Sequence, residues 1–106
     1  MTAVVQMYAI RHKPSGGYLP RPNGHAGRGG SHVEPRVFKD GSGHIPRMFP
    51  TMAGAKAALG QWLRGKHKGI REYEDGYYYT VGADIVPCPD RKREDMEIVT
   101  VEVTLP

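Results

Sequence analysis

The sequence is poor in the residues that define several protein classes, with one cysteine, one tryptophan and two phenylalanines among 106 positions. Because Cys88 is alone, the chain cannot form an internal disulfide, which fits a reducing cytosol. No segment approaches the roughly 20 apolar residues that a membrane-spanning helix requires. The first residues lack the basic head and long apolar middle of a signal peptide, so we expect a cytoplasmic protein.

Acidic residues are nearly absent from the first two thirds of the chain. Residues 1–71 hold twelve lysines and arginines but only two acids, for a net charge of +10. Residues 72–106 hold nine acids and three basic residues, for a net charge of −6. Some of these charges must meet in the folded protein. We nevertheless expect one face to stay positive, and such a face attracts phosphates or acidic protein surfaces.

One segment, residues 49–65, has the length and period of an amphipathic helix. Thr51 is placed to cap its N-terminus, and Gly65 is typical of the residue through which a chain leaves a helix. Gly60 lies on a second, nearly smooth side, which predicts close packing on a sheet or, as the alternative, a docked partner. The apolar residues recur at period 3.6 and form one stripe of Met52, Ala55, Leu59, Trp62 and Leu63.

Alternating apolar residues predict strands at both ends of the chain. We expect Val4–Arg11 to form a strand and Tyr18–Leu19 to form a short strand that returns beside it. Met96–Leu105 is the clearest strand, with Val99, Val101, Val103 and Leu105 on one face. One helix over one face of a mostly antiparallel sheet would bury both apolar stripes. We therefore expect a single α+β domain over residues 1–106.

The segments between the helix and the last strand predict a connector, a turn and a broken strand. We expect Lys66–Arg71 to be a basic connector and Glu72–Gly76 to be an acidic turn. Tyr77–Val86 has strong strand propensity, with a break or bulge expected at Gly82. Asp90–Asp95 predicts a turn or a single helical turn.

Residues 21–44 predict a long loop rich in glycine, arginine and histidine. The 24 positions hold six glycines, two prolines, four basic residues and three histidines. Loops of this length are usually functional or disordered. Successive backbone N–H groups around Gly24–Ser31 could form an anion-binding nest, although the lysine and helix of a nucleotide-binding P-loop are missing. A plain flexible loop is the alternative.

Three parts of the chain resemble a family of small accessory proteins encoded by tailed phages and prophages. The matching pieces are residues 8–16 with Leu19-Pro20, residues 46–49 leading into Ala55, Leu59, Trp62 and Gly65, and residues 91–99. The glycine-rich insert at 21–44 departs from that pattern. The resemblance implies an accessory protein that acts in the bacterial cytoplasm and brings no catalytic residues.

Catalytic and metal-binding patterns are weak. The five histidines and Cys88 lack the paired spacing of zinc modules, so we expect no metal and no cofactor. Cys88 lies between two prolines without an obvious activating partner, and no carboxylate pair has a setting that indicates a reaction. We therefore expect a protein that is not an enzyme.

The basic region leaves two functional hypotheses. The first is a non-catalytic phage protein that binds a host component, either an acidic protein surface or a phosphate-bearing ligand, and inhibits an anti-phage defence system. The second is a nucleic-acid-binding accessory protein, in which arginines contact phosphates and tyrosines stack on bases. An exposed edge of the last strand or of the first hairpin could also pair two chains into a homodimer. The candidate binding residues are Arg11, His12, Lys13, Arg21, Arg28, Arg36, Arg47, Arg64, Lys66 and Lys68.

Overall fold

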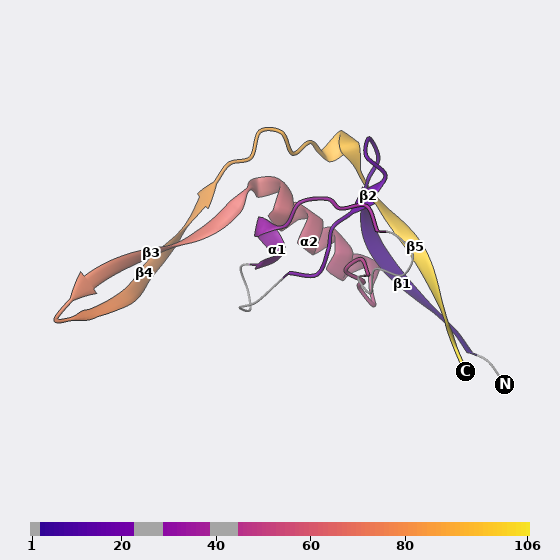
Figure 1. Ribbon diagram of the computed structural model, residues 1–106, viewed down its shortest axis with the longest axis horizontal. Helices are drawn as coiled ribbons and strands as arrows, with labels where there is room; N and C mark the ends of the chain where they lie inside the picture. Colours follow the sequence, from indigo (N-terminus) through magenta and orange to yellow (C-terminus); the bar gives the residue numbers. More distant parts are fainter. Residues whose placement is uncertain (1–2, 23–28, 39–44) are drawn as a thin grey trace.

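The computed structural model describes residues 3–22, 29–38 and 45–106, and for residues 29–30, 68–72 and 78–83 it describes the backbone alone. The fold is α+β with antiparallel sheets, as predicted (Figure 1). Its elements in chain order are β1 (Ala3–His12), β2 (Gly17–Tyr18), α1 (Gly29–His32), α2 (Met52–Arg64), β3 (Lys66–Glu74), β4 (Tyr77–Val86), the 3₁₀ turn η1 (Arg93–Asp95) and β5 (Met96–Leu105).

The first sheet joins the two ends of the chain in the order β2-β1-β5. β1 pairs with β5 along its whole length, from Ala3 opposite Leu105 to His12 opposite Met96. β2 pairs with the end of β1, and its Tyr18 also forms an isolated bridge with Arg36. The predicted strands at both ends are thereby confirmed, and the 3₁₀ turn confirms the short helical turn expected before β5.

Helix α2 packs on this sheet and closes the core. Ala55, Leu59 and Trp62, from the predicted stripe, are buried against Ile10 of β1 and Met96 of β5. The predicted N-cap is confirmed, because the Thr51 hydroxyl accepts a hydrogen bond of 3.1 Å from the Gly54 amide. The period of 3.6 therefore identified the helix and the centre of its buried face, whereas Leu63 of the stripe is only partly buried and Met52 is exposed.

Two predictions about the faces of these elements are wrong. Ile98 packs on the core, whereas the valines of β5 at 99, 101 and 103 lie on its opposite face and are only half-buried. The alternation alone could not show which face α2 would cover. The smooth side of α2 does not pack on the sheet either, because a Cβ at Gly60 would meet nothing within 4 Å and Ala53 and Ala57 are exposed.

A second sheet, of β3 and β4 only, forms a long hairpin. We refer to Lys66–Val86 as the arm, which extends away from the rest of the molecule (Figure 1) and gives it extents of 61 × 32 × 28 Å. The predicted basic connector Lys66–Arg71 is wrong, because these residues form the first part of β3. The acidic turn shortens to Asp75 and Gly76, whose φ angles of 51° and 84° are typical of a two-residue hairpin turn.

The predicted irregularity near Gly82 is confirmed by the pairing of the two arm strands. Ile70 lies opposite Gly82, whereas Arg71 lies opposite Thr80, so Val81 is an extra residue in β4. Such a bulge increases the local twist of a strand. It divides β4 into an outer part, Tyr77–Thr80, and an inner part that begins at Gly82.

The predicted loop at 21–44 contains a short helix, α1, that fastens the base of the arm to the rest of the chain. The Ser31 hydroxyl accepts a hydrogen bond of 3.0 Å from the His67 amide, and His32 Nε2 donates one of 2.6 Å to the His67 carbonyl. Val33 packs partly buried against the core. Residues 23–28 and 39–44, including much of the predicted anion nest, lie outside the described residues.

Arg91 connects α1, α2 and the segment before β5. Its guanidinium donates hydrogen bonds of 2.9 Å and 2.8 Å to the backbone carbonyls of Ser31 and Trp62. It lies 4.2 Å from the centroid of the Trp62 ring and makes an ion pair of 2.8 Å with Glu34. Only 3% of the Arg91 side chain is exposed, against 61% of that of Glu34. Arg91 is therefore a buried structural residue, and its bonds to the two carbonyls matter more than its exposed ion pair.

Candidate functional site: an arginine-lined pocket

A pocket of about 380 Å³ lies between the segment that follows β2 and the segment that leads into α2. Both segments are held by backbone hydrogen bonds. Pro20 and Pro46 form an antiparallel bridge, and the Arg47 amide donates a hydrogen bond of 3.0 Å to the Leu19 carbonyl. These backbone bonds therefore fix the two segments that form the walls of the pocket. Its lining residues are Arg21, Pro22, Ile45, Pro46, Arg47 and Met48.

Two arginines give this pocket its charge. Burial lowers the pKa of Arg47, and the nearby positive charge of Arg21 lowers it further. The Arg47 guanidinium also lies 4.7 Å from the centroid of the Phe49 ring, so its carbon stem and plane are supported by an aromatic side chain. Two like charges that share one pocket repel each other, and an anion between them would relieve that repulsion.

No carboxylate within the described part of the chain forms an ion pair with either arginine. The ion pairs found there are Arg11 with Glu97 and Arg91 with Glu34. Guanidinium groups have five donors in a planar fork, which matches the oxygens of a phosphate or carboxylate. Since Arg21 and Arg47 line one pocket and lack such a partner among the described residues, the chemistry that the pocket favours is anion binding.

Three of the predicted binding residues near the end of β1 take part in local structure. Arg11 donates a hydrogen bond of 2.7 Å to Glu97 on the neighbouring strand, and this bond raises the pKa of Arg11. His12 Nδ1 lies 2.7 Å from the Ser15 hydroxyl in the turn before β2. Lys13 donates its backbone amide to the Asp95 carbonyl at 2.8 Å, and its side chain is exposed. None of these three residues lines the pocket.

The other predicted binding residues are dispersed. Arg36 is exposed and pairs through its backbone with Tyr18, with two hydrogen bonds of 2.9 Å. Arg64 is exposed at the end of α2, and Lys66 is half-buried at the start of the arm. Arg28 and the side chain of Lys68 lie outside the described residues. Of the ten candidates, the structure brings Arg21 and Arg47 together in one pocket.

The pocket also contains residues that the sequence analysis did not select. Ile45, Pro46 and Met48 contribute apolar surface beside the two guanidinium groups. An apolar wall beside two cations suits a ligand with both an anionic group and an apolar or ring-shaped part.

The described residues show no cluster of three or more histidines, cysteines, aspartates or glutamates that could hold a metal ion. His25 and His44, two of the residues considered for such a site, lie outside them. No helix within the described ranges is long and apolar enough to cross a membrane.

No protein-family model matches this chain, and no curated protein or solved structure is significantly similar to it.

Proposed function

We propose that this chain is a non-catalytic accessory protein of a tailed phage, which binds an anionic host component in the bacterial cytoplasm and so inhibits an anti-phage defence system. The observation that carries the binding part is the pocket where Arg21 and Arg47 lie together without a carboxylate partner among the described residues. The phage origin and the defence role rest on the resemblance carried by residues 8–16, 46–49 and 91–99.

A phosphate-bearing small molecule is the ligand class that fits this pocket best. A volume of about 380 Å³ is within the range of small-molecule sites. The two guanidinium groups can bind phosphate oxygens, while Ile45 and Met48 offer apolar contact to a nucleoside or other ring. Capture of a nucleotide signal that activates a defence system would make a small protein without catalytic residues an effective inhibitor. An acidic protein surface is the alternative ligand, because its carboxylates could bind the same two guanidinium groups.

The nucleic-acid hypothesis finds less support at the tip of the arm, although its base carries Lys66, Lys68 and Arg71. Tyr73 and Tyr77 are exposed and could stack on bases, but they flank Glu74 and Asp75. Residues 72–84 hold four acids and no basic residue. Carboxylates at this density repel a phosphate backbone, whose neutralisation supplies most of the affinity of such complexes.

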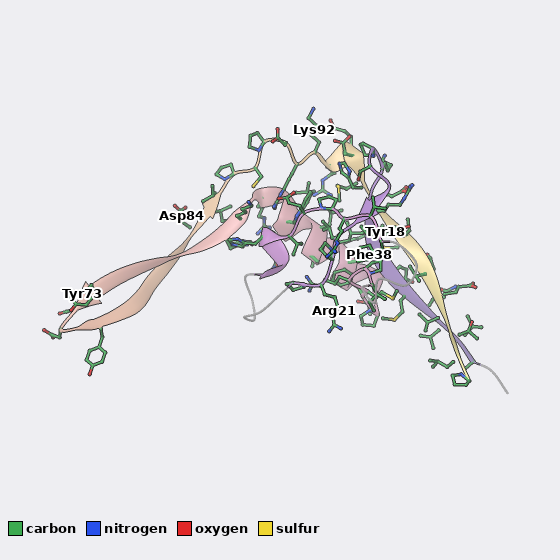
Figure 2. The ribbon with its side chains drawn as sticks, in the orientation of Figure 1. Tyr18, Arg21, Phe38, Tyr73, Asp84 and Lys92 are labelled. Carbon is green, nitrogen blue, oxygen red and sulfur yellow. The ribbon has the colours of Figure 1, made fainter. Side chains whose placement is uncertain are left out.

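Phage infection of bacteria that produce the protein tests the proposed function. In a strain with an active nucleotide-dependent defence system, wild-type protein should restore plaque formation, whereas Arg21→Gln/Arg47→Gln should not. The double variant removes two positive charges, so the matched control is Arg64→Gln/Lys92→Gln, which removes two exposed charges elsewhere. Figure 2 shows Lys92 and Arg21 on opposite sides of the molecule. The control should restore plaques as well as the wild type does.

Two results would contradict the proposal. If wild-type protein restores no plaques against any nucleotide-dependent system, the defence role fails. If purified protein binds DNA or RNA with an affinity that falls steeply as salt rises, and the two double variants weaken that affinity equally, the nucleic-acid hypothesis replaces it.

A further inference from the structure

The outer edge of β4 is an unpaired strand edge. In the second sheet β3 and β4 have only each other as strand partners among the described residues. One side of β4 therefore presents backbone N–H and C=O groups to which no described strand bonds. Such an edge is a template for pairing with another chain unless charge, proline or a bulge protects it.

The protection of the two arm strands is unequal. β3 carries five charged residues among nine, namely Lys66, Lys68, Arg71, Glu72 and Glu74. β4 carries one charge among ten residues, Asp84, and no proline. Its outer part, Tyr77–Thr80, is uncharged and rich in strand-forming tyrosine, and the bulge at Val81 lies beyond it. The outer part of β4 thus lacks each of the usual protections.

A two-stranded hairpin is marginally stable in water unless further strands or a helix pack on it, and in the arm α1 supplies such support at the base of β3. The arm is such a hairpin, and it also exposes large aromatic side chains, since 64% of Tyr73 and 76% of Tyr77 is accessible to solvent. Additional strands would bury tyrosine surface and satisfy the edge. These features indicate that the arm is completed by another strand.

We propose that β4 pairs antiparallel with β4 of a second copy of this chain, across a twofold axis at Tyr79, so that Tyr79 of one copy lies opposite Tyr79 of the other. The two arms then form one four-stranded sheet in the order β3-β4-β4-β3. A twofold axis places the same surface on both sides of the interface, so the strand must be compatible with itself. An uncharged segment meets this condition, because no like charges face each other. The two acidic turns at Asp75 lie on opposite sides of the axis, so they do not face each other.

The interface assigned to this dimer is the backbone edge of the outer part of β4, Tyr77–Thr80, which presents the same uncharged segment from both copies. Backbone hydrogen bonds along Tyr77–Thr80 add directionality. The partner proposed here is a second copy of the chain and is distinct from the anionic ligand proposed above. The arginine-lined pocket lies outside this interface.

The edge of β5 also has no further strand partner among the described residues, and it is a poorer candidate. β5 carries Glu97 and Glu102 along its length, and it belongs to a sheet of three strands on which α2 packs. Its stability does not depend on a further strand. The arm gains more from pairing, so the proposal assigns the interface to β4.

Sedimentation velocity of the full chain over a range of micromolar concentrations tests this dimer. We expect the mass to rise with concentration to twice the monomer mass of 11.7 kDa. Tyr79→Lys should weaken the dimer at least about tenfold, equivalent to 1.4 kcal/mol, because it brings like charges together near the axis. The matched control is Tyr73→Lys, which puts the same charge on β3 opposite Tyr78 and should leave the dimer within about threefold of the wild type.

Amide hydrogen exchange provides a second readout in the wild-type protein. Protection of the amides of 77–80 should increase with concentration, while Trp62 fluorescence, which reports on the core, shows that each variant is folded. Three results would overturn the proposal. They are a monomer at every concentration, equal weakening by Tyr73→Lys and Tyr79→Lys, and a dimer that survives Tyr79→Lys but is lost in Thr100→Lys on β5.

Discussion

Replacing Arg91 with methionine should lower the free energy of unfolding by about 3–5 kcal/mol, because two hydrogen bonds from a buried guanidinium are lost. Methionine fills much of the same space but cannot donate to the carbonyls of Ser31 and Trp62, which Arg91 reaches at 2.9 Å and 2.8 Å. The cation–π contact with the Trp62 ring is lost as well. A hydrogen bond to a charged group contributes about 1.5–3 kcal/mol, so two such bonds account for the expected loss.

Urea unfolding followed by Trp62 fluorescence measures this effect. Arg93→Met is the matched control, since Arg93 is exposed and lies only two residues away. Its effect should stay within about 0.5 kcal/mol, as for most surface substitutions. Arg91→Lys should recover little stability, because one ammonium group cannot reproduce the planar fork of donors. A loss below about 1 kcal/mol for Arg91→Met would show that these bonds do not hold α1 to α2.

Replacing Gly65 with alanine should destabilise the protein by about 3 kcal/mol or more, through backbone strain and a steric clash. Gly65 joins α2 to the arm with a φ of 124°, a conformation that residues with a side chain rarely adopt. A Cβ there would collide with the Val86 carbonyl oxygen and lie 2.9 Å from the Pro87 Cα. Because the neighbours are backbone atoms of the returning arm, no side-chain rotation can relieve the clash.

Gly60→Ala is the matched control, because it makes the same substitution inside α2. A Cβ at Gly60 would meet nothing within 4 Å, and glycine in a helix interior costs about 0.5–1 kcal/mol relative to alanine. Thermal unfolding should therefore show a higher midpoint for Gly60→Ala and a much lower one for Gly65→Ala. Equal midpoints for the wild type and Gly65→Ala would mean that the chain leaves α2 in a different conformation.

The elements that could be predicted from the sequence are those whose signal is local. α2 has a cap, a period and a terminal glycine within one segment, and β1 and β5 have clear alternation. β3 has none of these signals, because its lysines, arginine and glutamates have low strand propensity and its structure depends on pairing with β4. The protruding arm therefore depends on contacts between strands, which the composition of Lys66–Arg71 does not reveal.

Burial was the other property that the sequence could not show. Arg91 belongs to an Arg-Lys-Arg segment that has the composition of a solvated turn, yet it is buried while Lys92 and Arg93 are exposed. The pocket presents the same difficulty. Ten cationic or histidine residues were candidates on charge alone, and only the approach of residues 21–22 to 45–48 singles out Arg21 and Arg47.

The central claim is that Arg21 and Arg47 together bind an anionic ligand, and calorimetric titration with inorganic pyrophosphate and with a cyclic dinucleotide tests it most directly. The wild type and Arg64→Gln/Lys92→Gln should show saturable binding with one site per chain. Arg21→Gln/Arg47→Gln should lose at least about tenfold in affinity, equivalent to 1.4 kcal/mol. Absence of saturable binding by the wild type, or equal weakening in the two double variants, would contradict the assignment of the pocket.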